Sequence, residues 1–589
     1  AEQSQQSLFT DTTYGLDSGG SPRAITDLTY ERFAEFHRTY YHPSNAWIFF
    51  YGDDDPQARL ELLREYLDRF SALDVSSAVG RQEPFEGSRE VRLGFEAMGE
   101  DDEPLGMLTM NWLLPGKEDP ETVLACKILD GLLTGMNASP LRKALIESGL
   151  GEDLTGAGVE HEMAQMYYSV GMKGVLPENF EAVKALILST LQDIVAKGFE
   201  ADLIEAGINS AEFDLRENNT GSYPRGLIVM LRALGSWLYD LDPLELVAFE
   251  KPLAALKDRL ARGEKVFEDL IRRHILENAH HTVVVLEPED GYASRVDDEE
   301  QTLIRSLREA RADLSDEELV GRTEQLRRMQ ETPDSPEALA TLPCLSREDI
   351  DPEVRVVPTE ARDWDGATAL LHDLPTNDIC YLDLALDLGA VPEGLIPLVP
   401  LFGRALTEMG TDLEDYVSFS KRINSKTGGV YARTLLTQRE GAPDPVARLV
   451  VRAKAVGARV GDMLGIVGDA LTRPRFDDRE RFRQMVLEEK AGLEHALVPS
   501  GHHFVGLRLR SRFNLADSLQ ERMGGIENLL FLRELAGRID GDWPGVLADL
   551  EALRAAVIRR GGAVVNLTMD EAMLGAHGER FREFAAGLP

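Results

Sequence analysis

One order of predicted elements occurs twice in this chain, and the repeat limits the folds that the chain can adopt. The first copy is expected as a strand, two helices, a glycine-rich turn and a second strand, over residues 105–114, 121–133, 140–148, 149–158 and 166–175. The second copy begins roughly 275 residues further on and has the same order over residues 379–388, 395–408, 412–424, 427–429 and 430–436. Such a repeat favours two related domains that each pack helices on a sheet.

Further helices and strands are predicted around the two copies. Residues 180–197 form a long amphipathic helix, because Val183, Ile187, Leu191 and Ile194 share one face and Gly198 can end it. Residues 281–286 are apolar and predict a buried strand. In the second half, the pattern predicts helices over about 445–471 and 478–497.

The first 90 residues are expected to be the end of an α/β unit. A helix over residues 29–40 would direct Phe33 and Phe36 inward, and the apolar run 46–51 predicts a buried strand. A second helix would follow and extend to Phe70.

Residues 297–332 have a different character and predict a helical hairpin. Charged side chains surround sparse leucines, and Ser315 and Glu318 have the spacing of a capping box that begins a helix. A linker rich in proline follows, with prolines at 333, 336, 343 and 352. We therefore expect the main domain boundary of the chain here.

The length and the charge exclude some classes of protein. A chain of 589 residues corresponds to about four domains at roughly 150 residues each, and its 43% hydrophobic content is that of a globular protein. The formal net charge is −39, with 102 acidic against 63 basic residues, most of them arginine. Such a polyanion repels phosphate backbones, so we expect no nucleic-acid partner. It attracts cationic peptides, although the same acidity also serves solubility alone.

Cysteines and apolar runs argue against a secreted or membrane protein. Cys126, Cys344 and Cys380 lie far apart in the chain, so neither a disulfide framework nor a thiolate zinc site is predicted. No apolar run is long enough for a membrane helix, so no membrane partner is expected. The chain starts at Ala1 in what reads as the middle of a domain, which is the pattern of an internal fragment.

No complete metal motif is found among the 11 histidines. His161 and Glu162 begin an HExxH motif, but Gln165 stands where the second histidine is needed. His37 and His42 are five residues apart with Pro43 adjacent, which is poor geometry for a helical pair of ligands. The neighbouring pairs at 280–281 and 502–503 would point in different directions on regular backbone.

The other motifs for catalysis and nucleotide binding are also incomplete. Residues 17–22 resemble the loop that carries a serine nucleophile, but no histidine precedes Ser18, so a glycine-rich turn is the better interpretation. Residues 149–151 lack the third glycine of a dinucleotide-binding loop, and residues 426–429 lack the first glycine of a P-loop. The acidic runs 52–55 and 297–300 do not have EF-hand spacing.

Several longer strings resemble one known family. Tyr14-Gly-Leu-Asp-Ser-Gly-Gly20, Lys426-Thr-Gly-Gly429 and Ser500-Gly-His502 are similar to segments of the presequence protease branch of the pitrilysin/insulinase zinc metallopeptidases. Longer segments at 36–45, 51–56, 138–150, 212–226 and 330–339 extend the similarity in the same order. The resemblance therefore covers nearly the whole chain.

The resemblance implies a fold and a division into domains. Members of the family have repeated α+β domains with antiparallel sheets flanked by helices, and a helical hairpin joins two halves that close around a chamber for unfolded peptides. On this basis residues 1–90 are the C-terminal part of the first, catalytic-type domain, 91–290 the second domain, 291–352 the hinge and linker, and 353–589 the third domain. The family's zinc motif HxxEH and its last domain would lie outside this chain.

The third domain is expected to carry a degenerate copy of the zinc motif. Aligning Met409-Gly-Thr411 with the family's Lys-Gly-Thr places Leu401, Arg404 and Ala405 where His, Glu and His would stand. Leu and Ala cannot bind zinc, and Arg404 is a cation where the general base belongs. We therefore predict no catalytic residue and no metal ligand in this chain, and zinc only in its full-length parent; substrate-binding residues are not identified.

The sequence thus predicts part of a zinc metalloendopeptidase that degrades unfolded, basic oligopeptides in a closed chamber. This chain would supply chamber wall and hinge, would be inactive alone, and would need the remaining N- and C-terminal portions as partners. The expected location is cytoplasmic in a bacterium, or mitochondrial or plastid in a eukaryote. The alternatives are a non-catalytic peptide-binding or scaffolding protein of the same fold and an unrelated hydrolase using Ser18, which lacks the necessary partners.

Overall fold

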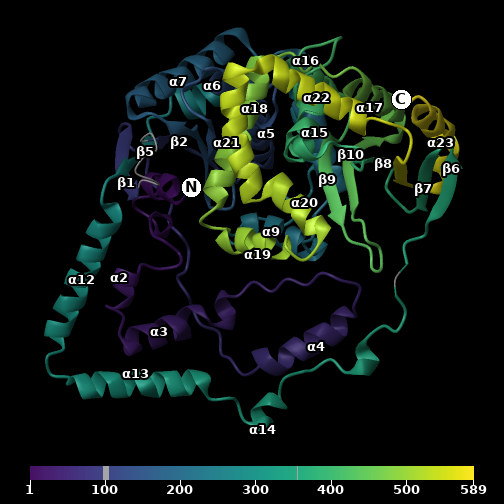
Figure 1. Ribbon diagram of the computed structural model, residues 1–589. Helices are drawn as coiled ribbons and strands as arrows, with labels where there is room; N and C mark the ends of the chain where they lie inside the picture. The colour runs from purple at the N-terminus through teal and green to yellow at the C-terminus, as the bar shows by residue number, and fades with distance from the viewer. Residues whose placement is uncertain (97–104, 355) are drawn as a thin grey trace. The chain divides into compact units, whose positions relative to one another are not determined.

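The computed structural model describes residues 1–96, 105–354 and 356–589 (Figure 1). The chain divides into two compact units. The larger unit holds residues Ala1–Leu93, a first sheet module that ends at Glu287, and a second sheet module from Thr359 to Pro589. The smaller unit contains the segment Pro288–Pro358.

The first module is built on a five-stranded sheet whose strands have the spatial order β1-β5-β2-β4-β3. The strands are β1 (Arg89–Glu96), β2 (Gly106–Gly116), β3 (Asp153–Glu160), β4 (Gln165–Val175) and β5 (His281–Glu289). β2 pairs antiparallel with both β4 and β5, and β3 pairs antiparallel with β4. Most of β2 is buried, as expected for a central strand with both faces covered.

Helices of the first module supply its core. They are α5 (Pro120–Asp130), α6 (Pro140–Glu147), α7 (Phe180–Lys197), α8 (Ala201–Glu217), α9 (Arg225–Trp237), α10 (Glu250–Ala261) and α11 (Val266–Ile271). Single turns extend or connect them at η3 (Gly131–Gly135), η4 (Pro177–Asn179) and η5 (Arg272–Leu276). The predicted helix 180–197 is confirmed as α7, and Gly198 follows it with φ of 83°, a conformation that favours glycine.

The N-terminal residues cover part of this sheet with a short helix. The Ser4 and Ser7 hydroxyls of α1 (Glu2–Leu8) lie 3.0 and 2.7 Å from the hydroxyls of Thr109 and Thr282, on β2 and β5. Further along the chain come η1 (Thr13–Gly15), α2 (Pro22–Ile25), α3 (Tyr30–Tyr40), η2 (Pro43–Asn45) and α4 (Pro56–Leu67).

The predicted burial of this N-terminal segment is wrong. The helix forms as α3, but Phe33 and Phe36 are 63% and 57% exposed. Residues 46–51, predicted as a buried strand, are not part of any sheet among the described residues. A strand needs neighbours for its backbone groups, and neither sheet of the described chain supplies them here.

The smaller unit contains the predicted helical hairpin. It consists of α12 (Tyr292–Ala310) and α13 (Asp316–Glu331), followed by the short turns α14 (Pro336–Leu339) and η6 (Arg347–Asp349). The predicted capping box is confirmed, because the Ser315 side chain accepts from the Glu318 N–H while the Glu318 carboxylate accepts from the Ser315 N–H.

The second module repeats the topology of the first. Its strands are β6 (Glu360–Trp364), β7 (Ala367–Asp373), β8 (Ile379–Asp387), β9 (Val430–Thr437), β10 (Val446–Val456) and β11 (Val564–Met569), in the order β6-β7-β11-β8-β10-β9. The run β11-β8-β10-β9 corresponds to β5-β2-β4-β3 of the first sheet. The repeat and the α+β class predicted from the sequence are therefore confirmed. All pairs in this sheet are antiparallel except the parallel pair β7–β11.

Helices follow the strands in the same order as in the first module. They are η7 (Glu393–Leu398), α15 (Val399–Glu408), α16 (Tyr416–Lys426), η8 (Gly457–Arg459), α17 (Val460–Thr472), α18 (Arg479–Ala496), α19 (Gly501–Arg510), α20 (Leu515–Gly524), α21 (Ile526–Gly541), α22 (Trp543–Val557) and α23 (Glu571–Ala586).

The helix predicted over 445–471 is wrong in its first half, where β10 forms. The segment Val-Ala-Arg-Leu-Val-Val-Arg-Ala-Lys-Ala-Val is rich in β-branched residues, and pairing with β8 and β9 on both sides outweighs the helical preference of its alanines.

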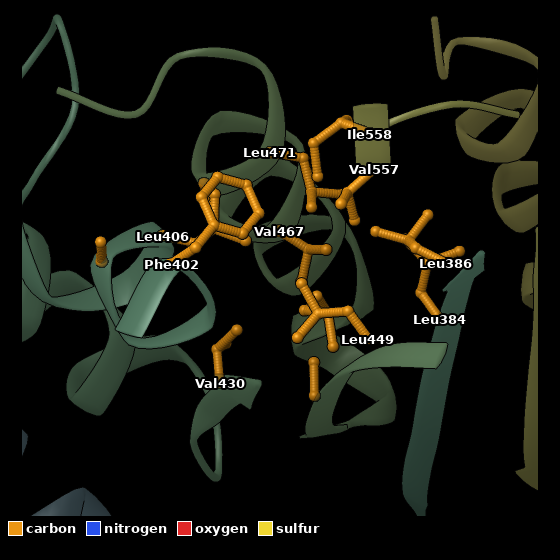
Figure 2. Packing of buried hydrophobic residues seen from close by; sticks show 14 of the residues in the cluster. Leu384, Leu386, Phe402, Leu406, Val430, Leu449, Val467, Leu471, Val557 and Ile558 are labelled. Carbon is orange, nitrogen blue, oxygen red and sulfur yellow. The ribbon is translucent and has the colours of Figure 1, made fainter. Parts of the chain in front are cut away.

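Each module has its own hydrophobic core. In the second module, side chains from the sheet, from α15 and α17 and from the end of α22 meet in one cluster, which Figure 2 shows around Phe402, Leu449 and Val467. Among the described residues, no helix is long and apolar enough to cross a membrane.

Candidate functional site

Helix α15 carries the three positions where the resemblance places a degenerate zinc motif. It begins after β8 and η7, and Pro400 occupies the first turn, where its missing N–H is not needed. The Leu401 and Ala405 side chains are buried in the core of the second module, at 1% and 0% exposure. Their neighbours Phe402 and Leu406 point into the same cluster (Figure 2).

The Arg404 side chain leaves this core and lies among three carboxylates. Its guanidinium donates to Glu408 at 2.9 and 3.0 Å, to Glu488 at 2.9 Å and to Glu489 at 3.1 Å. Glu408 lies one turn further along α15, whereas the other two glutamates come from α18. One arginine therefore ties α15 to α18.

Two more arginines complete the cluster. Arg481 of α18 donates to the Glu408 backbone oxygen and carboxylate, each at 3.2 Å. Arg142 of α6 donates to Glu488 at 3.2 Å. Three arginines thus face three glutamates, so the cluster is formally neutral, and Arg481 and Glu488 are buried.

The pKa shifts follow from this arrangement. Burial disfavours the charged form of Arg404, but the hydrogen bonds and charges of Glu408 and Glu488 outweigh it and raise the pKa of the guanidinium. Burial likewise opposes the Glu408 carboxylate, but Arg404 and Arg481 outweigh it and lower the pKa of that carboxyl. Both groups are held in their charged states.

This arrangement does not fit a zinc ion. Leu401 and Ala405 offer no donor atom and are packed in the core, and the Arg404 cation already occupies the carboxylates around it. In the part of the chain that the structure describes, no group of three or more His, Cys, Asp or Glu side chains is arranged to hold a metal ion.

The histidines singled out in the sequence lie in separate places. The His161 backbone oxygen accepts from the Lys117 ammonium at 3.1 Å, and burial lowers the pKa of the His161 imidazole to about 4. His280 is buried, stacked on Phe85 with ring centroids 3.6 Å apart, and its ring nitrogens contact the Phe85 N–H and the Leu8 carbonyl.

The remaining histidines have local roles. His281 contacts the Asn278 carbonyl, and His42 accepts from the Ser44 N–H at the start of η2. His37 stacks on Tyr41 within and after α3. His502 and His503 are neighbours in α19.

The other weak motifs are turns or helices in the structure. Ser18 lies in an exposed turn in which the Asp17 carboxylate accepts from the Gly19 N–H at 2.9 Å, as expected for a glycine-rich turn. Residues 149–151 connect α6 to β3, residues 426–429 connect α16 to β9, and residues 297–300 lie within α12.

Sequence patterns did not indicate the ionic cluster or the buried Lys117. Glu488, Glu489 and Arg142 are distant from Arg404 in sequence, so their convergence depends on the tertiary fold. Lys117 is 2% exposed, donates to two backbone carbonyls and lies over the Tyr239 ring at 4.6 Å. A lone lysine after a strand carries no signal for such burial.

Comparisons with known proteins agree with the resemblance. Residues 27–211 match the family model described as Peptidase M16 inactive domain, and residues 286–535 match the model of the domain associated with subgroup C of the M16 peptidases. Presequence protease 1, chloroplastic/mitochondrial, of Arabidopsis thaliana is 43% identical over 574 residues, covering 96% of this chain and 53% of that protein. Protein HypA of Clostridium perfringens is 34% identical over 570 residues, covering 96% and 58%.

Among solved structures, pitrilysin aligns with 99% of this chain and 58% of its own, with 13% identity and a TM-score of 0.42. The chain spans about half the length of the curated relatives that it matches.

Proposed function

Because this chain belongs to the presequence protease branch of the M16 peptidases, we propose that it forms wall and hinge of a chamber in which unfolded peptides are degraded. The observation that carries the proposal is the 43% identity over 96% of the chain to a protein named as a presequence protease. The substrate class would be unfolded oligopeptides, presequence-like and basic, which suits a chain with a net charge of −39.

In this proposal the zinc of the M16 metallopeptidases is bound by residues other than those of α15. The side chains at 401, 404 and 405 support this division of roles, since two are apolar and the third is a cation in a neutral ionic cluster. Peptide-bond hydrolysis would therefore depend on further chain, and residues 1–589 alone would be inactive.

The domain division remains the one expected from the sequence. Residues 1–90 would complete a first, catalytic-type domain, which would explain why so many of their apolar side chains are exposed in the described structure. Residues 91–290 and 353–589 would be the second and third peptidase-like domains, and 291–352 the hinge and linker. The helical pair α12 and α13 between the two sheet modules in chain order supports the hinge.

The location proposed is the cytoplasm of a bacterium, or a mitochondrion or plastid. The named relatives include both a chloroplastic/mitochondrial protein and one from Clostridium perfringens. A second candidate function is a non-catalytic peptide-binding or scaffolding protein, which the residues at 401, 404 and 405 also allow.

The test compares residues 1–589 alone with the same residues extended by the coding sequence on either side. A quenched fluorescent peptide is the substrate, and a zinc chelator is the control. We expect no turnover by the chain alone and chelator-sensitive turnover by the extended protein. Chelator-sensitive turnover that scales with the concentration of the unextended chain would refute the proposed division of roles. An extended protein that binds peptides without cleaving them would favour the second candidate.

A further inference from the structure

The two sheet modules meet within the larger unit along a surface that lysines and carboxylates dominate. On one side lie α6, α8 and the loop before α8, and on the other lie α16, α18 and β10. The lysine–carboxylate pairs that cross this surface, here called the lysine seam, are Lys421 with Glu200 and Asp202, Lys426 with Glu205, Lys454 with Glu217, and Lys490 with Glu152.

The distribution of lysine in the second module is the informative feature. The lysines of the seam are the only four between residues 359 and 589, whereas arginine is common throughout this stretch. Each of the four forms its ion pair with a carboxylate of the first module. Within the described residues, the arginine ion pairs of the second module all stay inside that module, apart from Glu488 accepting from Arg142 of the first.

The seam is partly dehydrated and includes neutral contacts. The Lys490 and Glu152 side chains are each 20% exposed and 2.7 Å apart, and Glu217 beside Lys454 is 4% exposed. The Asn209 amide of α8 donates to the Asn424 carbonyl at 2.6 Å. The Phe213 ring packs on the backbone of Gly428, where a Cβ atom would lie 2.3 Å from it.

Lysine and arginine differ in the way that suits this division. A guanidinium is weakly hydrated and binds carboxylates through a rigid fork, which favours permanent pairs, whereas an ammonium is a compact and strongly hydrated charge on a flexible stem. Separating a lysine pair is therefore assisted by rehydration of the ammonium. The second module uses arginine for its internal ion pairs and lysine where it meets the other module.

We propose that the lysine seam is a reversible electrostatic latch, which holds the two sheet modules together at low ionic strength and releases them as salt screens its ion pairs. Four attractive pairs of one polarity act in parallel, and the Debye length shortens from about 10 Å at 0.1 M salt to about 3 Å at 1 M. This inference does not depend on the proposed peptidase function.

The latch can be measured in the full chain by energy transfer between two fluorophores. Ser189 on α7 and Ala576 on α23 are exposed, belong to different modules and lie outside the seam, so each can be changed to cysteine and labelled. Cys344, which is exposed, is first changed to serine, whereas Cys126 and Cys380 are buried. We expect transfer efficiency to fall as NaCl rises from about 0.05 to about 1 M.

Three variants separate the latch from general effects of charge. Changing the four seam lysines to glutamine should raise the ratio of separated to closed modules by about two- to fivefold per lysine. Changing the same four to arginine should shift the transition to higher salt, and this variant keeps all four charges in case the glutamine variant folds poorly. The control is Lys184→Gln, because Lys184 is 15% exposed and pairs with Glu90 and Glu181 inside the first module.

The control should follow the wild-type salt curve. Transfer efficiency that stays constant with salt in the wild type, or a glutamine variant that follows the wild-type curve, would overturn the latch. Either result would mean that the Phe213 and Asn209 contacts hold the modules together without help from the charges.

Discussion

At position 404 a guanidinium lies among three carboxylates, and its removal would leave buried charge without a partner. We predict that Arg404→Met lowers the free energy of unfolding by about 2–4 kcal/mol, because Glu488 and Glu408 would remain largely buried. The measurement is urea unfolding followed by circular dichroism. Arg459→Met is the matched control, since Arg459 pairs with Asp462 on the surface of the same module and should contribute less than about 1 kcal/mol. Equal losses for the two variants would contradict the assignment of a structural role to the cluster.

Lys117 gives a prediction about pH. Burial, followed by the charge of Lys127, lowers the pKa of the Lys117 ammonium to about 8, compared with about 10.4 in an unfolded chain. Between these two values the unfolded chain binds a proton that the folded chain has released, so the Lys117 contribution to stability increases as the pH rises through this window. The difference in unfolding free energy between wild type and Lys117→Met should therefore change by about 2 kcal/mol in favour of the wild type between about pH 7.5 and 10.5. A difference that is constant with pH would show that Lys117 titrates as an ordinary lysine.

Among the elements, those whose sequence pattern matched their burial could be predicted, and those that depend on distant partners could not. α7 was predictable because its apolar face and Gly198 lie within one segment. β10 was not, since its alternation only becomes decisive once β8 and β9 pair on both sides of it. The apolar run 46–51 was predicted as a strand from composition, but composition cannot supply the neighbouring strands. The degenerate positions 401, 404 and 405 could be located from the sequence, whereas the partners of Arg404 could not.

The linker after α13 is the element most open to a protease. Residues 332–354 are exposed and contain only the short turns α14 and η6, and exposed backbone with few hydrogen bonds is cut first. We predict that limited proteolysis of the full chain cuts first between Glu331 and Pro352 and leaves fragments of roughly 330 and 240 residues. Mass spectrometry of the early products identifies the site. A first cut between β2 and β4 would mean that the proposed domain division is wrong.

At the scale of the whole molecule, the charge of −39 and the relation to presequence proteases lead to one prediction about substrates. If part of the negative charge faces the chamber, a cationic peptide is attracted as it approaches, over a Debye length of about 8 Å at physiological salt. The gain should appear mainly in the association rate and therefore in kcat/KM at low substrate concentration. The seam lysines neutralise some carboxylates of the first module, so the attraction depends on the remaining acidic side chains.

The measurement uses the chain extended by its flanking coding sequence and two peptides that share one cleavable core, one with basic and one with acidic ends. We expect kcat/KM to be higher for the basic peptide by about tenfold at low salt, and the ratio to approach one at high salt, because screening removes long-range attraction but not contacts at the cleavage site. A folded protein of the same net charge as the basic peptide should resist cleavage, because the chamber excludes it by size. Equal rates for the two peptides at low salt would assign the acidity to the outer surface, where its effect is on solubility, and would leave the peptidase proposal to be judged by the chelator experiment alone.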